Sequence, residues 1–198
     1  IDFRERAPQK SSPEMWTVGA DGKVVGNQKL EGGKAAAVPG EVAGLLYALE
    51  NYGTMSREQV IRPAANLAKN GFYVTPTLSN DMKSQFDKLE KYPESAKVFL
   101  NQEGLPYEVD DLFTNPDMAK TLDIIIKNGK DGFYKGEVAE AIVKTLNKYD
   151  GLYTMEDLAN YKPLVRQPVK GTYRGYEIIS SPSPSSGGAI VIEILNIL

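Results

Sequence analysis

The sequence predicts an α+β fold, mainly helical, with strands on both sides of the helices and an apolar helix at the end. Three observations lead to this prediction. Helical periodicity dominates residues 40–160, strand-like patterns occur near residues 1–25 and 165–180, and the segment 186–198 is apolar on nearly every side. No internal repeat interrupts this order. We therefore expect residues 1–198 to form one partial domain.

Strand signals come first along the chain. In IDFRE, the apolar residues Ile1 and Phe3 alternate with charged residues, which is typical of a half-buried strand. The stretch MWTVGADGKVVG then predicts a hairpin that turns within its ADG tripeptide.

The middle section carries helix signals with clear beginnings and ends. Ser56 and Gln59 form a capping box at the start of a helix that Gly71 ends. Asn115 caps another helix, and Gly129 ends it. Helices are predicted over residues 39–53, 56–71, 75–92, 114–129, 135–151 and 154–161.

The pattern changes to strands again after these helices. RQPVKGTYRGYEIISSP is rich in β-branched and aromatic residues around Arg174-Gly175, which predicts a tight hairpin. The following SPSPSSGG is extended by its two prolines, and Ser185 or Ser186 can cap the next helix. An all-round apolar helix over 186–198 is expected to be buried, so we expect the chain to be a piece of something larger. If it stays exposed, this helix favours a dimer.

The composition excludes several classes of function. The chain has 0 His and 0 Cys, so thiolate nucleophiles, Ser-His triads and the usual zinc sites are excluded, and we expect no cofactor and no metal. A net charge of -3 gives no reason to expect nucleic acid as a partner. No apolar run is long enough for a transmembrane segment.

Two features are candidates for a functional site. The guanidinium of Arg4 could bind a substrate carboxylate in a bidentate manner, or it could pair with Asp2, Glu5 or another surface carboxylate. Ser185, Ser186, Gly187 and Gly188 could present free backbone N–H groups to an anion, or they could cap and closely pack a buried helix. The spacing alone leaves both alternatives open.

Several stretches together resemble the large subunit of bacterial γ-glutamyltranspeptidases. They are IDFRERAP, VPGEVAGLLYALENYGTMS, IRPAANLAKNGF, NGKDGFYKGEVAEAIV, GLYTMEDLANYKPLVRQPVKGTYRGYEI and PSPSSGGAIVIEILNIL, and they cover essentially the whole chain. The resemblance implies a truncated αββα fold of the N-terminal-nucleophile hydrolases. It also implies a precursor that cleaves itself before a Thr, which then attacks the γ-glutamyl amide of glutathione or a related small molecule.

The resemblance gives Arg4 a role, because the arginine of the DFRE stretch holds the α-carboxylate of the γ-glutamyl group in that family. Ser185 to Gly188 match a family signature, with no role carried over. No threonine here matches the nucleophile, so we expect the C-terminal small subunit of the same precursor to supply it, and this chain alone to be inactive. Export to the periplasm, the cell surface or the medium is implied by kinship. An inactive γ-glutamyl-binding or assembly module on the same scaffold is the alternative.

Overall fold

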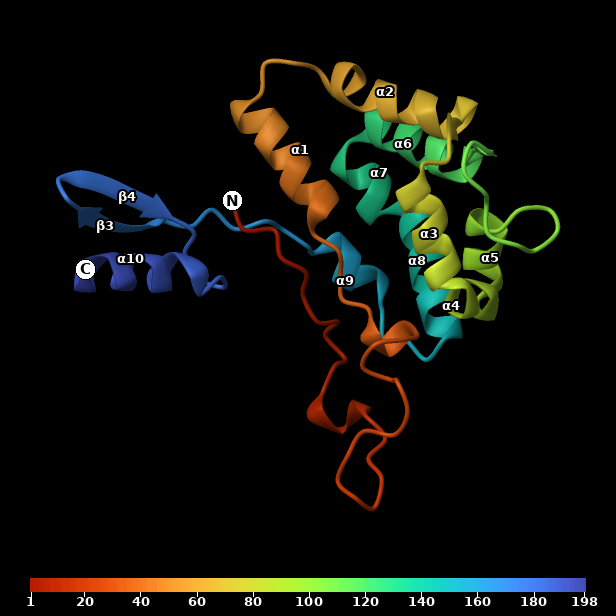
Figure 1. The fold of residues 1–198 in the computed structure, drawn as a ribbon, viewed down its shortest axis with the longest axis horizontal. Coiled ribbons are helices and arrows are strands. Elements are labelled where there is room, and N and C mark those ends of the chain that lie inside the picture. The colour runs from red at the N-terminus through yellow and green to blue at the C-terminus, as the bar shows by residue number, and fades with distance from the viewer.

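The computed structural model describes residues 1–198 and places them in a helical body and a smaller arm (Figure 1). The helices of the body are α1 (Glu41–Tyr52), α2 (Arg57–Asn70), α3 (Pro76–Ser84), α4 (Phe86–Lys91), α5 (Pro93–Phe99), α6 (Pro116–Asn128), α7 (Lys130–Tyr134), α8 (Gly136–Lys148) and α9 (Met155–Ala159). The arm consists of β3 (Val169–Tyr173), β4 (Tyr176–Ser180) and α10 (Gly187–Ile197). The N-terminus lies where the arm meets the body. This mainly helical architecture confirms the predicted fold class.

The helix ends follow from local chemistry, as predicted. The Ser56 hydroxyl accepts a hydrogen bond from the Gln59 N–H, and the Gln59 side chain accepts one from the Ser56 N–H. The Asn115 side chain accepts a bond from the Met118 N–H at the start of α6. Gly129 ends α6 with a φ of 61°, a conformation that suits glycine.

Other helical details differ from the prediction. The helix expected over 75–92 is divided into α3 and α4, because Gln85 leaves the helical conformation with φ −109° and ψ 14°. Helix α5, which has Pro93 in its first turn, and the short α7 were not predicted. A two-residue pair, β1 (Phe72–Tyr73) with β2 (Leu112–Phe113), was also missed because neither strand is long enough to show a period.

The strand predicted at the start of the chain does not form, and the hairpin predicted after it forms only over a short length, with hydrogen bonds from the Gly19 N–H to the Lys23 carbonyl and from the Val25 N–H to the Thr17 carbonyl, each of 2.8 Å. Residues Asp2 and Arg6 each form an isolated bridge, Asp2 with Leu164 and Arg6 with Val38. Because the two partners belong to different segments, no continuous ladder develops. The expected hairpin is reduced to the single bridge between residues 18 and 24.

The hairpin of the arm forms as predicted. Strands β3 and β4 pair antiparallel, from Val169 opposite Ser180 to Tyr173 opposite Tyr176. Arg174 and Gly175 make the turn with φ values of 48° and 85°. Two successive positive φ values match the twist of the strands, and this explains the tight connection.

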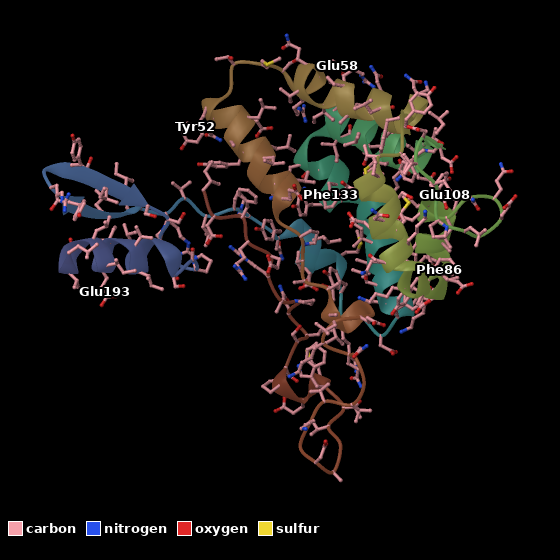
Figure 2. All side chains as sticks on the ribbon, in the orientation of Figure 1. Tyr52, Glu58, Phe86, Glu108, Phe133 and Glu193 are labelled. Carbon is pink, nitrogen blue, oxygen red and sulfur yellow. The ribbon has the colours of Figure 1, made fainter.

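Only one side of helix α10 packs against the hairpin. Gly188, Ile192 and Leu195 are its buried or half-buried residues, and they recur at helical spacing. Glu193 projects away from the hairpin (Figure 2). The remaining apolar side chains of this helix are exposed, namely Ile190, Val191, Ile194, Ile197 and Leu198. β3 and β4 cover a single stripe of this helix, so residues 1–198 do not themselves supply the burial expected for its other sides.

The main core joins α1, α7, α8 and α9. It contains Val38, Ala43, Tyr134, Ala139, Tyr153, Leu158 and Tyr161. A smaller cluster of Val74, Met82 and Phe113 lies where α3 covers β1 and β2. None of the helices has the length and hydrophobicity required to span a bilayer. The main core is the part of the fold that supports the residues described next.

Replacing Leu158 with Ala tests this core. Leu158 has 0% exposure, so the substitution removes buried methyl groups and leaves a cavity. We expect the free energy of unfolding to fall by about 2–5 kcal/mol, measured by urea denaturation with far-ultraviolet circular dichroism. The matched control is Leu67→Ala on the exposed side of α2, for which we expect a change of about 0.5 kcal/mol or less. Equal effects of the two substitutions would contradict this assignment of the core.

Candidate functional site

A cleft of about 1130 Å³ lies where the N-terminal segment, the approach to α1 and the arm meet. Its walls come from residues 1–5, from the segment around Pro39 to Glu41, and from the strand and loop that precede α10. The volume is enough for a small-molecule ligand. Arg4 and Ser185, which are 181 positions apart in the sequence, both line it. The fold thus brings one residue from each of the two sequence candidates to a single cavity.

The Arg4 side chain has no close ionic partner. Its side chain is 64% exposed, and its Nε lies 3.6 Å from a carboxylate oxygen of Glu5. An exposed ion pair of that length contributes little. Most of the hydrogen-bonding capacity of the guanidinium is therefore available to a ligand in the cleft.

The second arginine of the cleft is already engaged. Arg166 lines the same cavity, and its Nε lies 2.6 Å from Asp2 Oδ2. The backbone N–H of Arg4 donates to the other oxygen of Asp2 at 3.0 Å. The hydrogen bond from the Arg4 N–H, and after it the contact with Arg166, hold the pKa of Asp2 below its usual value. The carboxylate therefore keeps its charge. Arg4 is therefore the better candidate to bind an incoming carboxylate.

The backbone around Arg4 is held along residues 157–164. Asp2 and Leu164 exchange two hydrogen bonds of 2.7 Å, and the Tyr161 hydroxyl donates to the Arg4 carbonyl at 2.8 Å. Farther along, the Gln9 N–H donates to the carboxylate of Asp157 at 2.8 Å. The backbone at Arg4 is therefore fixed, whereas its guanidinium has no close partner.

Gly40, the residue before α1, and Gly44 within α1 allow this segment to lie close to the body. A Cβ at Gly40 would lie 2.0 Å from the Phe3 carbonyl, and one at Gly44 would lie 2.1 Å from the Phe3 ring. Both distances are far below a van der Waals contact, so only glycine fits. Sequence reasoning missed Gly40, Gly44 and Tyr161, because only their long-range contacts give them a role.

The four residues of the signature loop have different surroundings. Ser185 faces the cleft and its hydroxyl accepts a long hydrogen bond of 3.4 Å from the Gly187 N–H. Ser186 occupies the cap position of α10, with no capping hydrogen bond from its side chain. A Cβ at Gly188 would lie 2.1 Å from the Ser181 carbonyl, whereas one at Gly187 would meet only ordinary contacts. Close packing therefore explains why position 188 is a glycine. Of these four residues, only Ser185 lies in the cleft wall.

No cluster of three or more His, Cys, Asp or Glu side chains is arranged to hold a metal ion. The polar groups of the cleft are instead those of Arg4, Arg166, Asp2, Glu5 and Glu41, together with serine residues. Such an arrangement can bind an organic molecule that carries both a carboxylate and an amine. It holds no evident nucleophile with an adjacent base.

Comparison with known proteins agrees with these features. The family described as gamma-glutamyltranspeptidase matches residues 1–198. A glutathione hydrolase proenzyme of Escherichia coli (strain K12) is 42% identical over 198 residues, which are 100% of this chain and 34% of that protein. The chain therefore spans about one third of the length of this relative.

Two solved structures resemble the chain closely. The crystal structure of Helicobacter pylori gamma-glutamyltranspeptidase superposes with a TM-score of 0.94 and 44% identity, covering 99% of this chain and 56% of that one. The gamma-glutamyltranspeptidase from Pseudomonas nitroreducens, complexed with L-DON, gives a TM-score of 0.86 at 31% identity, covering 96% and 55%. The fold, including the arm and α10, is thus shared with these proteins.

The two glycines at the start of α10 offer a matched pair of substitutions. We expect Gly188→Ala to destabilise the arm by about 1–3 kcal/mol, because its methyl group would overlap the Ser181 carbonyl. Gly187→Ala is expected to be neutral or to stabilise the helix by up to about 1 kcal/mol. Hydrogen exchange of the α10 amides measures both effects. Similar exchange in the two variants would show that the packing against Ser181 is unimportant.

Asp157 predicts a dependence of stability on pH. Burial raises the pKa of this carboxyl, but hydrogen bonds from the Gln9 N–H and from Thr154 outweigh that effect and lower it. A lowered pKa stabilises the folded chain above the usual value of about 4, and this stabilisation is lost as the pH falls through the folded-state pKa. We therefore expect Asp157→Asn to be less stable than the wild type at neutral pH, and the difference to shrink below about pH 4. Urea denaturation at several pH values measures it, and parallel curves would contradict the assignment.

Proposed function

The chain belongs to the γ-glutamyltranspeptidase family, and we propose that it forms part of an enzyme that hydrolyses or transfers the γ-glutamyl group of glutathione and related γ-glutamyl amides. The match over residues 1–198 and the 42% identity to a glutathione hydrolase proenzyme support this proposal. The leaving group and the acceptor depend on residues outside this chain.

In the proposed site, Arg4 binds the α-carboxylate of the γ-glutamyl group. The observation that carries this role is the Arg4 guanidinium, whose one ion pair is the long, exposed contact with Glu5, in a cleft whose other arginine, Arg166, is neutralised by Asp2. Guanidinium and carboxylate are matched in geometry, so two parallel hydrogen bonds fix the orientation as well as the position of the substrate. The distant amide is thereby placed for attack.

The bond-breaking step requires groups that residues 1–198 do not supply in this proposal. The hydroxyl of an N-terminal Thr, formed by self-cleavage of a precursor, attacks the γ-carbonyl while its own α-amine takes the proton. The amide C–N bond breaks and the amine leaves with a proton. Water or an amino acid then takes the γ-glutamyl group from the threonine. The proenzyme names of the relatives support such a precursor.

We further propose that this chain is inactive alone, that the small subunit of the same precursor is its partner, and that the protein is exported. The exposed apolar side of α10 supports the need for a partner, since an exposed row of aliphatic side chains is unfavourable in water. A second copy of the chain is the other occupant that this surface would accept. An inactive binding module remains the competing function, and activity of the full-length protein on γ-glutamyl amides separates the two.

Arg4→Lys in the full-length protein tests the role of the guanidinium. Lysine keeps the charge but cannot make the bidentate contact, so we expect the KM for a chromogenic γ-glutamyl anilide to rise about 10- to 100-fold. The matched control is Arg174→Lys in the exposed turn of the hairpin, for which we expect unchanged kinetics. A KM within about twofold of the wild type for Arg4→Lys would overturn the proposed role.

A further inference from the structure

The position of the Arg4 guanidinium depends on its backbone. The side chain itself makes only the long contact of 3.6 Å with Glu5, so no close partner fixes it. On the backbone, the bridges of Asp2 and of Arg6 lie two residues to either side. At Arg4 itself the backbone N–H donates to Asp2 Oδ1 at 3.0 Å, a contact within the same segment, and the carbonyl accepts the 2.8 Å hydrogen bond from the Tyr161 hydroxyl, which ties Arg4 to the body.

Tyr161 is well placed to hold this peptide. It is 2% exposed, and its ring stacks on that of Tyr134 with a centroid distance of 5.7 Å and an interplanar angle of 9°. The Arg6 guanidinium also lies over this ring, 5.3 Å from its centroid. Lys130 donates a hydrogen bond to the Tyr161 carbonyl. The ring, the backbone and the hydroxyl of this residue are thus all constrained.

Tyr134 extends the same support to α1. It is 0% exposed, and its hydroxyl donates to the Pro39 carbonyl at 2.8 Å and accepts from the Ala43 N–H at 3.2 Å. Pro39 and the neighbouring Gly40 also line the cleft, and Gly40 lies against the Phe3 carbonyl. The two stacked tyrosines therefore hold two of the segments that line the cleft.

Both hydroxyls keep their protons at physiological pH. Burial raises the pKa of Tyr134 to about 12, and burial also raises the pKa of Tyr161. A phenol that stays protonated remains a hydrogen-bond donor. The donation to the Arg4 carbonyl therefore persists at neutral pH, where a carboxylate ligand is charged.

We propose that Tyr161 is a positioning residue for the γ-glutamyl substrate, which acts by fixing the Arg4 peptide through its hydroxyl. This inference rests on the proposed function, in which Arg4 binds the α-carboxylate. Without the hydrogen bond, the peptide would still be tethered at Asp2 and Arg6, so the chain would fold but the guanidinium would sample a wider range of positions. The effect would appear in substrate binding and only where the substrate carries the α-carboxylate.

The test is Tyr161→Phe in the full-length enzyme, assayed on two substrates. One is a γ-glutamyl anilide, and the other is 4-aminobutanoyl anilide, which has the same amide without the α-carboxylate. We expect the KM for the first to rise about three- to tenfold, with kcat changed less than about twofold, because one neutral hydrogen bond is removed. The kcat/KM for the second is expected to stay at the wild-type value.

A double variant tests whether Tyr161 acts through Arg4. If it does, adding Tyr161→Phe to Arg4→Lys raises the KM no further, since the contact that Tyr161 supports is already lost. The control is Tyr153→Phe, which removes a hydroxyl from a residue of the same core cluster whose hydrogen bonds, with Asn147, are made by its backbone. We expect this control to behave as the wild type on both substrates.

The outcomes separate this inference from the proposed function. If Arg4→Lys raises the KM but Tyr161→Phe leaves it unchanged, or lowers activity equally on both anilides, Tyr161 is structural only and the inference is overturned. If Arg4→Lys itself has no effect, the carboxylate site fails and the inference fails with it. A rise in KM confined to the γ-glutamyl substrate, absent in the Arg4→Lys background, supports both.

Discussion

The feature on which the candidate site depends is the attachment of the N-terminal segment to residues 157–164. Four contacts make this attachment, from Asp2 to Leu164, Arg4 to Tyr161, Arg6 to Lys162 and Gln9 to Asp157. Without it, the N-terminal segment would keep mainly the bridge of Arg6 with Val38 and the ion pair of Asp2 with Arg166, and the cleft wall that residues 1–5 form would be poorly held. With respect to the site, the main role of the helical body is therefore to hold one extended segment in place.

Local chemistry made much of the fold predictable from the sequence. The capping box of Ser56 and Gln59, the cap at Asn115 and the turn at Arg174-Gly175 depend on residues close in sequence, so their signals are visible without a structure. The strand expected at residues 1–5 failed for the opposite reason. Its alternation was real, but its partners come from two distant segments that allow only isolated bridges.

The candidate site was predictable only in part. The sequence indicates Arg4 and Ser185 as site candidates from their residue types and their neighbours. Only the fold shows that they line one cavity. Nothing in the neighbouring sequence marks Gly40 and Gly44, because a glycine is required there only by the Phe3 segment that lies against them. The same holds for Tyr161, which is one of several scattered tyrosines until its hydroxyl is seen at the Arg4 carbonyl. Residues that act at long range cannot be recognised from spacing.

The hydrogen bond between Tyr161 and Arg4 joins residues 157 positions apart in the chain, and this separation has a consequence for biosynthesis. Chains emerge from the ribosome from the N-terminus onward, and contacts of large sequence separation carry a high entropic cost of loop closure. The N-terminal segment of this chain therefore remains without its partners until residues 157–164 have been translated. The cleft wall that residues 1–5 form is thus among the last parts of this chain to become ordered.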